Sequence, residues 1–249
     1  MNLLNKNHFF IFLTTLLLLS FEANCQFNVI SLSTGLTTMK IIGDSPNSSL
    51  MIPHDLSKPT VIGGSFNGTN SGIALRANIA LNKTGDFIIP IGIEYIFLWA
   101  AESTPLGKLT KQFARNTNTI PTITMGFDYK FFKFPFADVK AYAGLELRAS
   151  FIQSGELNYK VVYGQIDSTD NRTVHIKPPA IRGGYAFKLG IDGQIIDRVR
   201  INVNFGLGLL NYIGRDNKRG ELFTPSYLYE NYESRVYMFN FDFLIQYQI

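Results

Sequence analysis

Strict alternation of apolar and polar residues recurs along most of the chain. Seven segments have this period of two, which is typical of β-strands with two unlike faces. They cover residues 73–81, 87–99, 123–131, 139–151, 181–195, 199–209 and 237–249. In the second segment, for example, Ile91, Ile93 and Tyr95 alternate with Gly92 and Glu94. No long stretch after residue 26 has the 3.6-residue period of a helix, so the pattern predicts an all-β fold.

The charged residues within these seven segments all lie on the polar face. They are Arg76, Glu94, Asp128, Lys130, Lys140, Glu146, Arg148, Arg182, Lys188, Asp192, Arg200 and Asp242. One face is therefore kept free of charge along the whole set of strands. An eighth strand is predicted over residues 27–41, where apolar residues occur in both registers, and a bulge midway is expected to switch its faces.

Short and long connections alternate between the predicted strands. Residues 82–86, 132–138 and 196–198 form short connections with turn residues such as Gly85 and Pro135. Residues 42–72, 100–122, 152–180 and 212–236 form long ones. This order places all short turns and both termini at one end, and it predicts an eight-stranded antiparallel up-and-down transmembrane β-barrel with four long external loops.

Alternation alone does not determine whether the apolar face points inward or outward, because a soluble lipocalin-like barrel shows the same alternation with its apolar face inward. The strand lengths fit a membrane crossing, which needs about 9–11 tilted residues. The polar face mixes glycine with opposite charges, as expected for a crowded lumen in which these charges form ion pairs. Aromatic residues gather at the strand ends, as in the two girdles at lipid headgroups. They are Phe97, Trp99, Phe151, Tyr185 and Tyr237 at the loop end, and Phe87, Tyr129, Phe131 and Tyr247 at the turn end.

Residues 1–25 are predicted to be a secretory signal peptide, followed by the barrel domain at residues 26–249. The segment has Lys6 near its start and an apolar stretch over residues 9–21, which is too short for a transmembrane helix. Cys25 is either removed with this leader or acylated as a lipoprotein anchor. Glu22 and Asn24 replace the small residues expected before a lipidated cysteine, which favours removal. With one cysteine, a disulfide framework and a multi-thiolate metal site are excluded.

The leader, the eight strands, the alternating loop lengths and the C-terminal run resemble the small outer-membrane β-barrel proteins of Gram-negative bacteria. That run contains Phe239, Phe241, Phe243, Ile245, Tyr247 and Ile249. The resemblance implies a location in the bacterial outer membrane, contact with outer-membrane lipids, and insertion by the barrel-assembly machinery, which recognises an aromatic C-terminus in this family. Family members usually end in Phe, whereas this chain ends in Ile249.

Composition and sequence motifs do not identify a catalytic or ligand-binding activity. A hydrophobic content of 46% and a charged content of 17% exclude a disordered chain, and a net charge of +4 is too small to indicate nucleic-acid binding. His54, Asp55 and Ser57 form a conceivable hydrolytic set, but they lie in the first long loop and not on a lipid-facing strand. His175 is isolated. No catalytic, metal-binding or cofactor-binding residue is assigned, no cofactor is expected, and the protein is predicted not to be an enzyme.

Glycines in the penultimate strand superficially match a dinucleotide-binding motif. Gly206, Gly208 and Gly214 have the wrong spacing for that motif, and no helix follows them. They are therefore predicted to be lumen glycines.

The long loops are the better candidates for function. Residues 157–167 and 172–177 predict a hairpin with its turn around Ser168–Asn171, and its edges are suited to pairing with a strand of another protein. Tyr227, Tyr229 and Tyr232 form a candidate aromatic contact surface in the last loop. For both, the alternative is simple strand extension with ordinary interfacial tyrosines.

The sequence therefore predicts a structural or binding protein that acts through its external loops, with a protein partner there. Two other functions remain open. A narrow solute conduit requires a wet path past Arg148, Glu146 and Arg182, although an eight-stranded barrel is by default filled by its own side chains. A lipid A-modifying enzyme is the third reading, because some small outer-membrane barrels that resemble this one act on lipid A.

Overall fold

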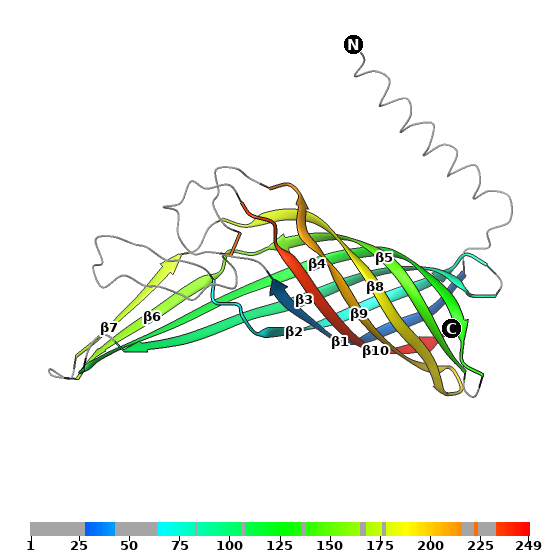
Figure 1. The fold of residues 1–249 in the computed structure, drawn as a ribbon, viewed down its shortest axis with the longest axis horizontal. Helices are drawn as coiled ribbons and strands as arrows, with labels where there is room; N and C mark the ends of the chain where they lie inside the picture. The colour runs from blue at the N-terminus through cyan, green and yellow to red at the C-terminus, as the bar shows by residue number, and fades with distance from the viewer. Residues whose placement is uncertain are drawn as a thin grey trace, which may run out of the picture.

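The computed structural model describes residues 28–42, 64–82, 84–105, 108–135, 138–164, 168–175, 178–215, 222–223 and 233–249. Their regular secondary structure is entirely antiparallel β (Figure 1). Its ten strands are β1 (Asn28–Ile42), β2 (Thr69–Ala80), β3 (Phe87–Pro105), β4 (Thr110–Lys133), β5 (Val139–Ile152), β6 (Glu156–Tyr163), β7 (Ser168–His175), β8 (Ala180–Ile196), β9 (Val199–Ile213) and β10 (Tyr237–Gln248). Among these residues, none forms a helix long and apolar enough to cross a membrane.

Eight of the strands close into a ring in the order β1-β2-β3-β4-β5-β8-β9-β10. The first and last strands close it, with Ser31 opposite Gln248 at one end of the pair and Ile42 opposite Tyr237 at the other. The predicted eight-stranded barrel is therefore confirmed. A closed ring satisfies the backbone hydrogen bonds of every strand within the sheet, which a structure surrounded by lipid requires.

The three predicted short turns join β2 to β3, β4 to β5, and β8 to β9. In the first of them Gly85 has a φ of 65°, a left-handed conformation that glycine adopts without strain. These turns lie at the same end of the molecule as the C-terminus, and the β6–β7 hairpin lies at the opposite end (Figure 1). The predicted separation of short and long connections is thus confirmed for these turns.

The first strand differs from its prediction. Alternation is unbroken from Ser31 to Ile42, and the shift in register with β2 lies between Val29 and Ser31. An irregularity of the expected kind is therefore present, but at the start of the strand and not midway. Apolar residues occur in both registers for another reason: Leu36 points outward, whereas Met39 lies inside the barrel in an apolar cluster at its loop end.

The segment 100–122, predicted as a long loop, is mostly strand. β3 continues to Pro105 and β4 begins at Thr110, and the two remain paired as far as Pro105 opposite Lys111. β4 has 24 residues, whereas a membrane crossing needs about 9–11. Residues 110–119 of β4 lie beyond the ring and carry the sheet roughly 30 Å past it.

The predicted hairpin exists, but its turn is displaced and it does not stand alone. Residues 164–167 separate β6 from β7, so the predicted turn residues Ser168–Asn171 belong to β7. β6 pairs with β4, from Thr117 opposite Glu156 to Thr110 opposite Tyr163. Residues 97–105 of β3, residues 110–119 of β4, and β6 and β7 thus form one four-stranded extension, which we call the projecting sheet.

Candidate functional site

The outer surface of the ring is apolar. Ile93 is 55% exposed, whereas the adjacent Glu94 on the inner face is 1% exposed. The same contrast recurs around the ring. Exposed side chains include Leu36, Ile73, Leu75, Ile123, Met125, Leu145, Leu147, Phe187, Leu189, Phe205, Leu207, Phe243 and Ile245. The apolar face therefore points outward, as predicted. Leu209, which pairs with the outward Tyr185 and Tyr237, is on this face but buried.

The predicted aromatic residues also lie on this outer surface. Phe97, Trp99 and Tyr237 are exposed toward the loop end, and Phe131 and Tyr247 toward the turn end. At the turn end the rings of Phe87 and Tyr129 stack, with centroids 4.8 Å apart. Amphipathic aromatic rings are favoured at the boundary between acyl chains and headgroups, so the two groups mark the height of the membrane-spanning part.

The centre of the bore, which is the interior of the ring, contains a buried ion-pair network. Arg76 Nη2 donates to Glu94 Oε1 at 2.5 Å and to Asp242 Oδ2 at 2.7 Å. Arg148 donates to Glu94 and, at 2.7 Å, to Glu146 Oε1. All five side chains are at most 4% exposed, which confirms the predicted network.

Lys188 extends the network around the bore. Its Nζ donates to Glu146 Oε2 at 2.7 Å and lies 3.9 Å from Asp128 Oδ1. Its side chain is 3% exposed. Six strands of the ring supply the groups of this central network: β2, β3, β4, β5, β8 and β10. Breaking one ion pair therefore leaves a charge uncompensated in a site without bulk water.

A second set of ion pairs lies toward the turn end of the bore. Asp192 accepts from Lys130 Nζ at 2.5 Å and from Arg200 Nε at 2.7 Å. Arg200 Nη1 also donates to Asp138 Oδ2 at 3.0 Å. A hydrogen bond from Arg200 and the nearby Lys133 ammonium lower the pKa of Asp138, which lies in the β4–β5 connection.

The β2–β3 turn has a similar carboxylate. A hydrogen bond with the Thr84 side chain and one from Lys140 Nζ, at 2.9 Å, lower the pKa of Asp86. Asp86 and Asp138 are both about a third or more exposed, so solvent screens these pairs.

The loop end of the bore is closed differently, by apolar side chains. Phe66 and Phe223 come from outside the strands and meet edge to face, with ring centroids 5.9 Å apart. Inward-facing residues of the strands surround them: Met39, Ile41, Ile96, Leu98, Ala100, Ile120, Ile152, Ala186, Leu210 and Met238, with Leu222 and Val236 from the connections. We call this group the apolar plug. Arg182 is buried at this end and pairs with Glu233 at 2.6 Å, away from the central network.

The other residues singled out in the sequence have mixed outcomes. Gly206 and Gly208 face the bore, as predicted. Gly214 does not: it follows the end of β9 and has a φ of 86°, so it is a turn glycine. His175 is the last residue of β7. The remaining candidates lie outside the described residues: Cys25, His54, Asp55, Ser57, Tyr227, Tyr229 and Tyr232, together with the predicted signal peptide. Among the described residues, no three metal-binding side chains form a cluster.

An apolar outer surface around a charged, filled interior is the inverse of a soluble barrel. Exposing so many aliphatic and aromatic side chains to water would be unfavourable, whereas lipid acyl chains accommodate them. The chain is a transmembrane β-barrel protein. No protein-family model matches its sequence, and no curated protein matches it either.

Several solved structures are similar in fold at low sequence identity. Neisserial surface protein A, NspA, is 11% identical with a TM-score of 0.43, and the match covers 90% of this chain and 99% of NspA. Ail, the attachment invasion locus protein of Yersinia pestis, was solved with the heparin analogue sucrose octasulfate. That structure is 11% identical, with a TM-score of 0.38 and coverage of 88% of this chain and 96% of Ail. A second Ail structure is 12% identical with a TM-score of 0.32, covering 88% of this chain and 95% of Ail.

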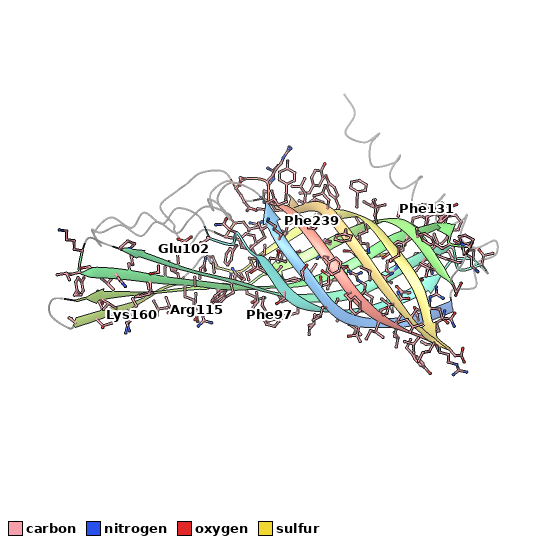
Figure 2. All side chains as sticks on the ribbon, turned by 60° about the horizontal axis from the view of Figure 1, so that its bottom comes forward. Phe97, Glu102, Arg115, Phe131, Lys160 and Phe239 are labelled. Atoms are coloured by element: carbon pink, nitrogen blue, oxygen red, sulfur yellow. The ribbon has the colours of Figure 1, made fainter. Side chains whose placement is uncertain are left out.

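The projecting sheet is the feature that sequence reasoning missed. Its inner face carries buried apolar residues such as Leu157, Tyr159 and Val161. Its outer face carries exposed Arg115 and Lys160, which lie on the same side as Phe97 and opposite Glu102 (Figure 2). A sequence signal for this sheet is present in β6, where Leu157, Tyr159 and Val161 alternate with polar residues. Residues 110–119 of β4 have no such signal, because both of their registers are mainly polar.

Proposed function

We propose that the barrel is a membrane anchor and that the projecting sheet is the binding part of the protein, with another protein's strand pairing along β7. The observation that supports this most directly is the unequal length of the strands. β3 and β4 continue well beyond the ring and β6 and β7 lie wholly beyond it, while the bore contains paired charges and the apolar plug. A sheet of this length is not needed to cross the membrane, so its use lies outside it.

The edge of β7 is the surface offered to such a partner. β7 pairs on one side with β6, from Glu156 opposite His175 to Tyr163 opposite Ser168. In the part of the chain that the structure describes, no strand pairs with its other side. An open edge presents unpaired backbone N–H and C=O groups, and an extended peptide can add to them as a further strand.

The filled bore argues against the solute conduit. The central network occupies its middle and the apolar plug its loop end. The cavity toward the turn end, lined by Asp128, Tyr142 and Arg200 among others, has a volume of about 30 Å³, which is room for a water molecule or two. Planar-bilayer recordings of the refolded protein should therefore show no steady current. A reproducible open-channel current would support the solute conduit instead.

Site-specific photo-cross-linking tests the binding role. A photoreactive residue replaces Asn171, which is exposed on β7, and the matched control carries it at Arg198, in the β8–β9 turn at the opposite end. With full-length protein in its native membrane, we expect a protein adduct from position 171 and none from position 198. The same adducts from both positions, or none from position 171, would reject a partner at this edge.

A variant with a shortened β6–β7 hairpin gives a second test of the binding role. Glu156 and His175 face each other across the β6–β7 pair, so a two-residue Asn-Gly turn can join them after deletion of residues 157–174. The deletion should abolish capture while the barrel still shows the heat-shifted gel mobility of a folded β-barrel. Capture that persists without β7 would place the contact elsewhere.

A further inference from the structure

A shallow depression lies on the outer face of the projecting sheet. It has a volume of about 520 Å³ and crosses all four strands. Its lining includes Ser103 of β3, Phe113 and Arg115 of β4, Lys160 of β6 and Asn171 of β7. Cross-strand pairing places Ser103, Phe113, Lys160 and Asn171 in one row, and the next row toward the membrane contains Arg115. The depression is therefore built by the sheet register and not by one loop.

The charge of this face is predominantly positive. Lys111, Arg115 and Lys160 are exposed on it, and no carboxylate of the described residues lies within ion-pair distance of any of the three. Glu156 is the acidic side chain on the same face, one row closer to the membrane beside Thr117. The three cations are thus available to an anionic ligand, and their mutual repulsion is relieved when one binds.

The position of the depression relative to the membrane identifies the kind of ligand. The face that carries it continues the lipid-facing side of the barrel: Phe97 and Trp99 pair with Thr119 and Thr117, and Arg115 is the next outward residue of β4 (Figure 2). At about 3.3 Å per residue, Arg115 lies roughly 7 Å beyond the Trp99 row, and Lys160 lies roughly 13 Å beyond it. These are headgroup heights above an aromatic girdle at the acyl-chain boundary.

The side chains have the chemistry to bind a phosphorylated sugar. A guanidinium such as that of Arg115 binds phosphate oxygens with two parallel hydrogen bonds, and the Lys160 ammonium adds a point charge. Phe113 is 44% exposed beside Lys160 and offers a flat apolar surface to a sugar ring. Asn158 and Asn171 offer amide donors and acceptors to hydroxyl groups.

We propose that this depression binds the phosphorylated saccharide headgroup of a glycolipid in the outer leaflet of the same membrane. The acyl chains of that glycolipid lie against the outward apolar residues of β3, such as Ile93 and Phe97, and the phosphate meets Arg115 and Lys160. Continuity with the lipid-facing surface favours this source over a soluble anionic saccharide. The proposal concerns the face of the sheet, so it does not depend on a protein partner at the β7 edge.

Native mass spectrometry of the full-length refolded protein in detergent tests the proposal. The probe is a purified bacterial glycolipid with a phosphorylated saccharide headgroup, compared with the same glycolipid after chemical removal of its phosphates. The double variant R115Q/K160Q should weaken binding of the phosphorylated probe roughly tenfold or more, because each basic contact to an anionic headgroup contributes about 1 kcal/mol. The matched control K133Q/R198Q removes two exposed basic residues at the opposite rim and should leave binding unchanged.

Other results of these binding measurements would contradict the proposal or its membrane source. Equal binding of the dephosphorylated glycolipid, or unchanged binding by R115Q/K160Q, would overturn the proposal. Tight binding of the free phosphorylated headgroup without acyl chains, equal to that of the glycolipid, would overturn the membrane source. Retained heat-shifted mobility shows that R115Q/K160Q is folded. Cross-linking from position 171 should survive in this variant, so failure here is distinguishable from failure of the protein-partner proposal.

Discussion

The membrane-spanning and projecting parts of β3 and β4 have the same alternation of outward and inward positions but different side chains on the outward face. In the ring, Ile93 and Ile123 point outward and Glu94 points into the bore. Beyond the ring, Arg115 points outward on the same side of β4, while Ala114 faces the buried side. Along one continuous pair of strands the outward face thus changes from apolar to mainly polar and charged when the surrounding solvent changes from lipid to water. The backbone sets the period, and the solvent sets which side chains occupy the outward face.

Removing a charge from the bore should give the largest effect and distinguish the two parts most clearly. E94A leaves Arg76 and Arg148 with one carboxylate fewer in a buried site, so we expect the free energy of unfolding to fall by about 3–5 kcal/mol. Glu156, exposed on the projecting sheet, supplies the matched variant E156A, expected to change stability by less than about 0.5 kcal/mol. Urea unfolding in phospholipid vesicles measures both. Similar losses of stability in E94A and E156A would show that the buried ion pairs of the bore contribute no more to stability than an exposed charge.

Adding a charge to the outward face tests this change of surroundings directly within one strand. I93R places a guanidinium among acyl chains and should cost about 2–4 kcal/mol, whereas S103R, ten residues further along β3 on the same side, should be nearly neutral. The same unfolding titration compares them. If I93R were as stable as S103R, Ile93 would not face the lipid interior.

Deleting buried volume in the projecting sheet should destabilise that sheet and spare the ring. Leu157 is fully buried against Tyr159 and Val161, and L157A should cost about 2 kcal/mol or more locally. We expect faster proteolysis within β6 and β7, with unchanged heat-shifted mobility of the barrel. K160A, on the exposed face of the same strand, is the control. Loss of barrel mobility in L157A would show that the two parts unfold as one unit.

Acidification should produce the smallest effect, at the turn rim and not in the projecting sheet. The pKa values of Asp86 and Asp138 are lowered in the folded protein, so their contribution is present at neutral pH and is lost as pH falls through those lowered values. Because both carboxylates are partly exposed, the loss between pH 7 and pH 2.5 that they cause should total less than about 1 kcal/mol. The pH dependence of unfolding in D86N/D138N, compared with the natural sequence, isolates it. An identical pH dependence in the two proteins would show that these ion pairs do not contribute to stability.

Sequence periodicity predicted most of the barrel because its signal is local. Each crossing alternates between one solvent, lipid, and one crowded interior, so segments such as residues 199–209 indicate both strand and orientation. The ion-pair network followed from charge counting on the polar face. Its partners did not: Arg76 meets Asp242, 166 residues away in sequence, and Arg182 meets Glu233 in a connection.

The projecting sheet was missed because β4 loses its apolar positions beyond the ring. Residues 110–119 are mainly polar in both registers, so a rule based on outward apolar residues ends the strand near residue 120. The turn between β6 and β7 was misplaced for a related reason. Ser168–Asn171 are common turn residues, but pairing of β6 with β4 and of β7 with β6 holds them in an edge strand.

The chain's own pattern determined that it crosses a membrane as eight strands with its charges inside, because side-chain direction in a strand depends only on parity. Tertiary structure alone decided where each strand ends, which charges meet, and that Arg115, Phe113 and Lys160 share one face. Those outcomes depend on register between strands distant in sequence, and register is fixed by the whole closed sheet at once.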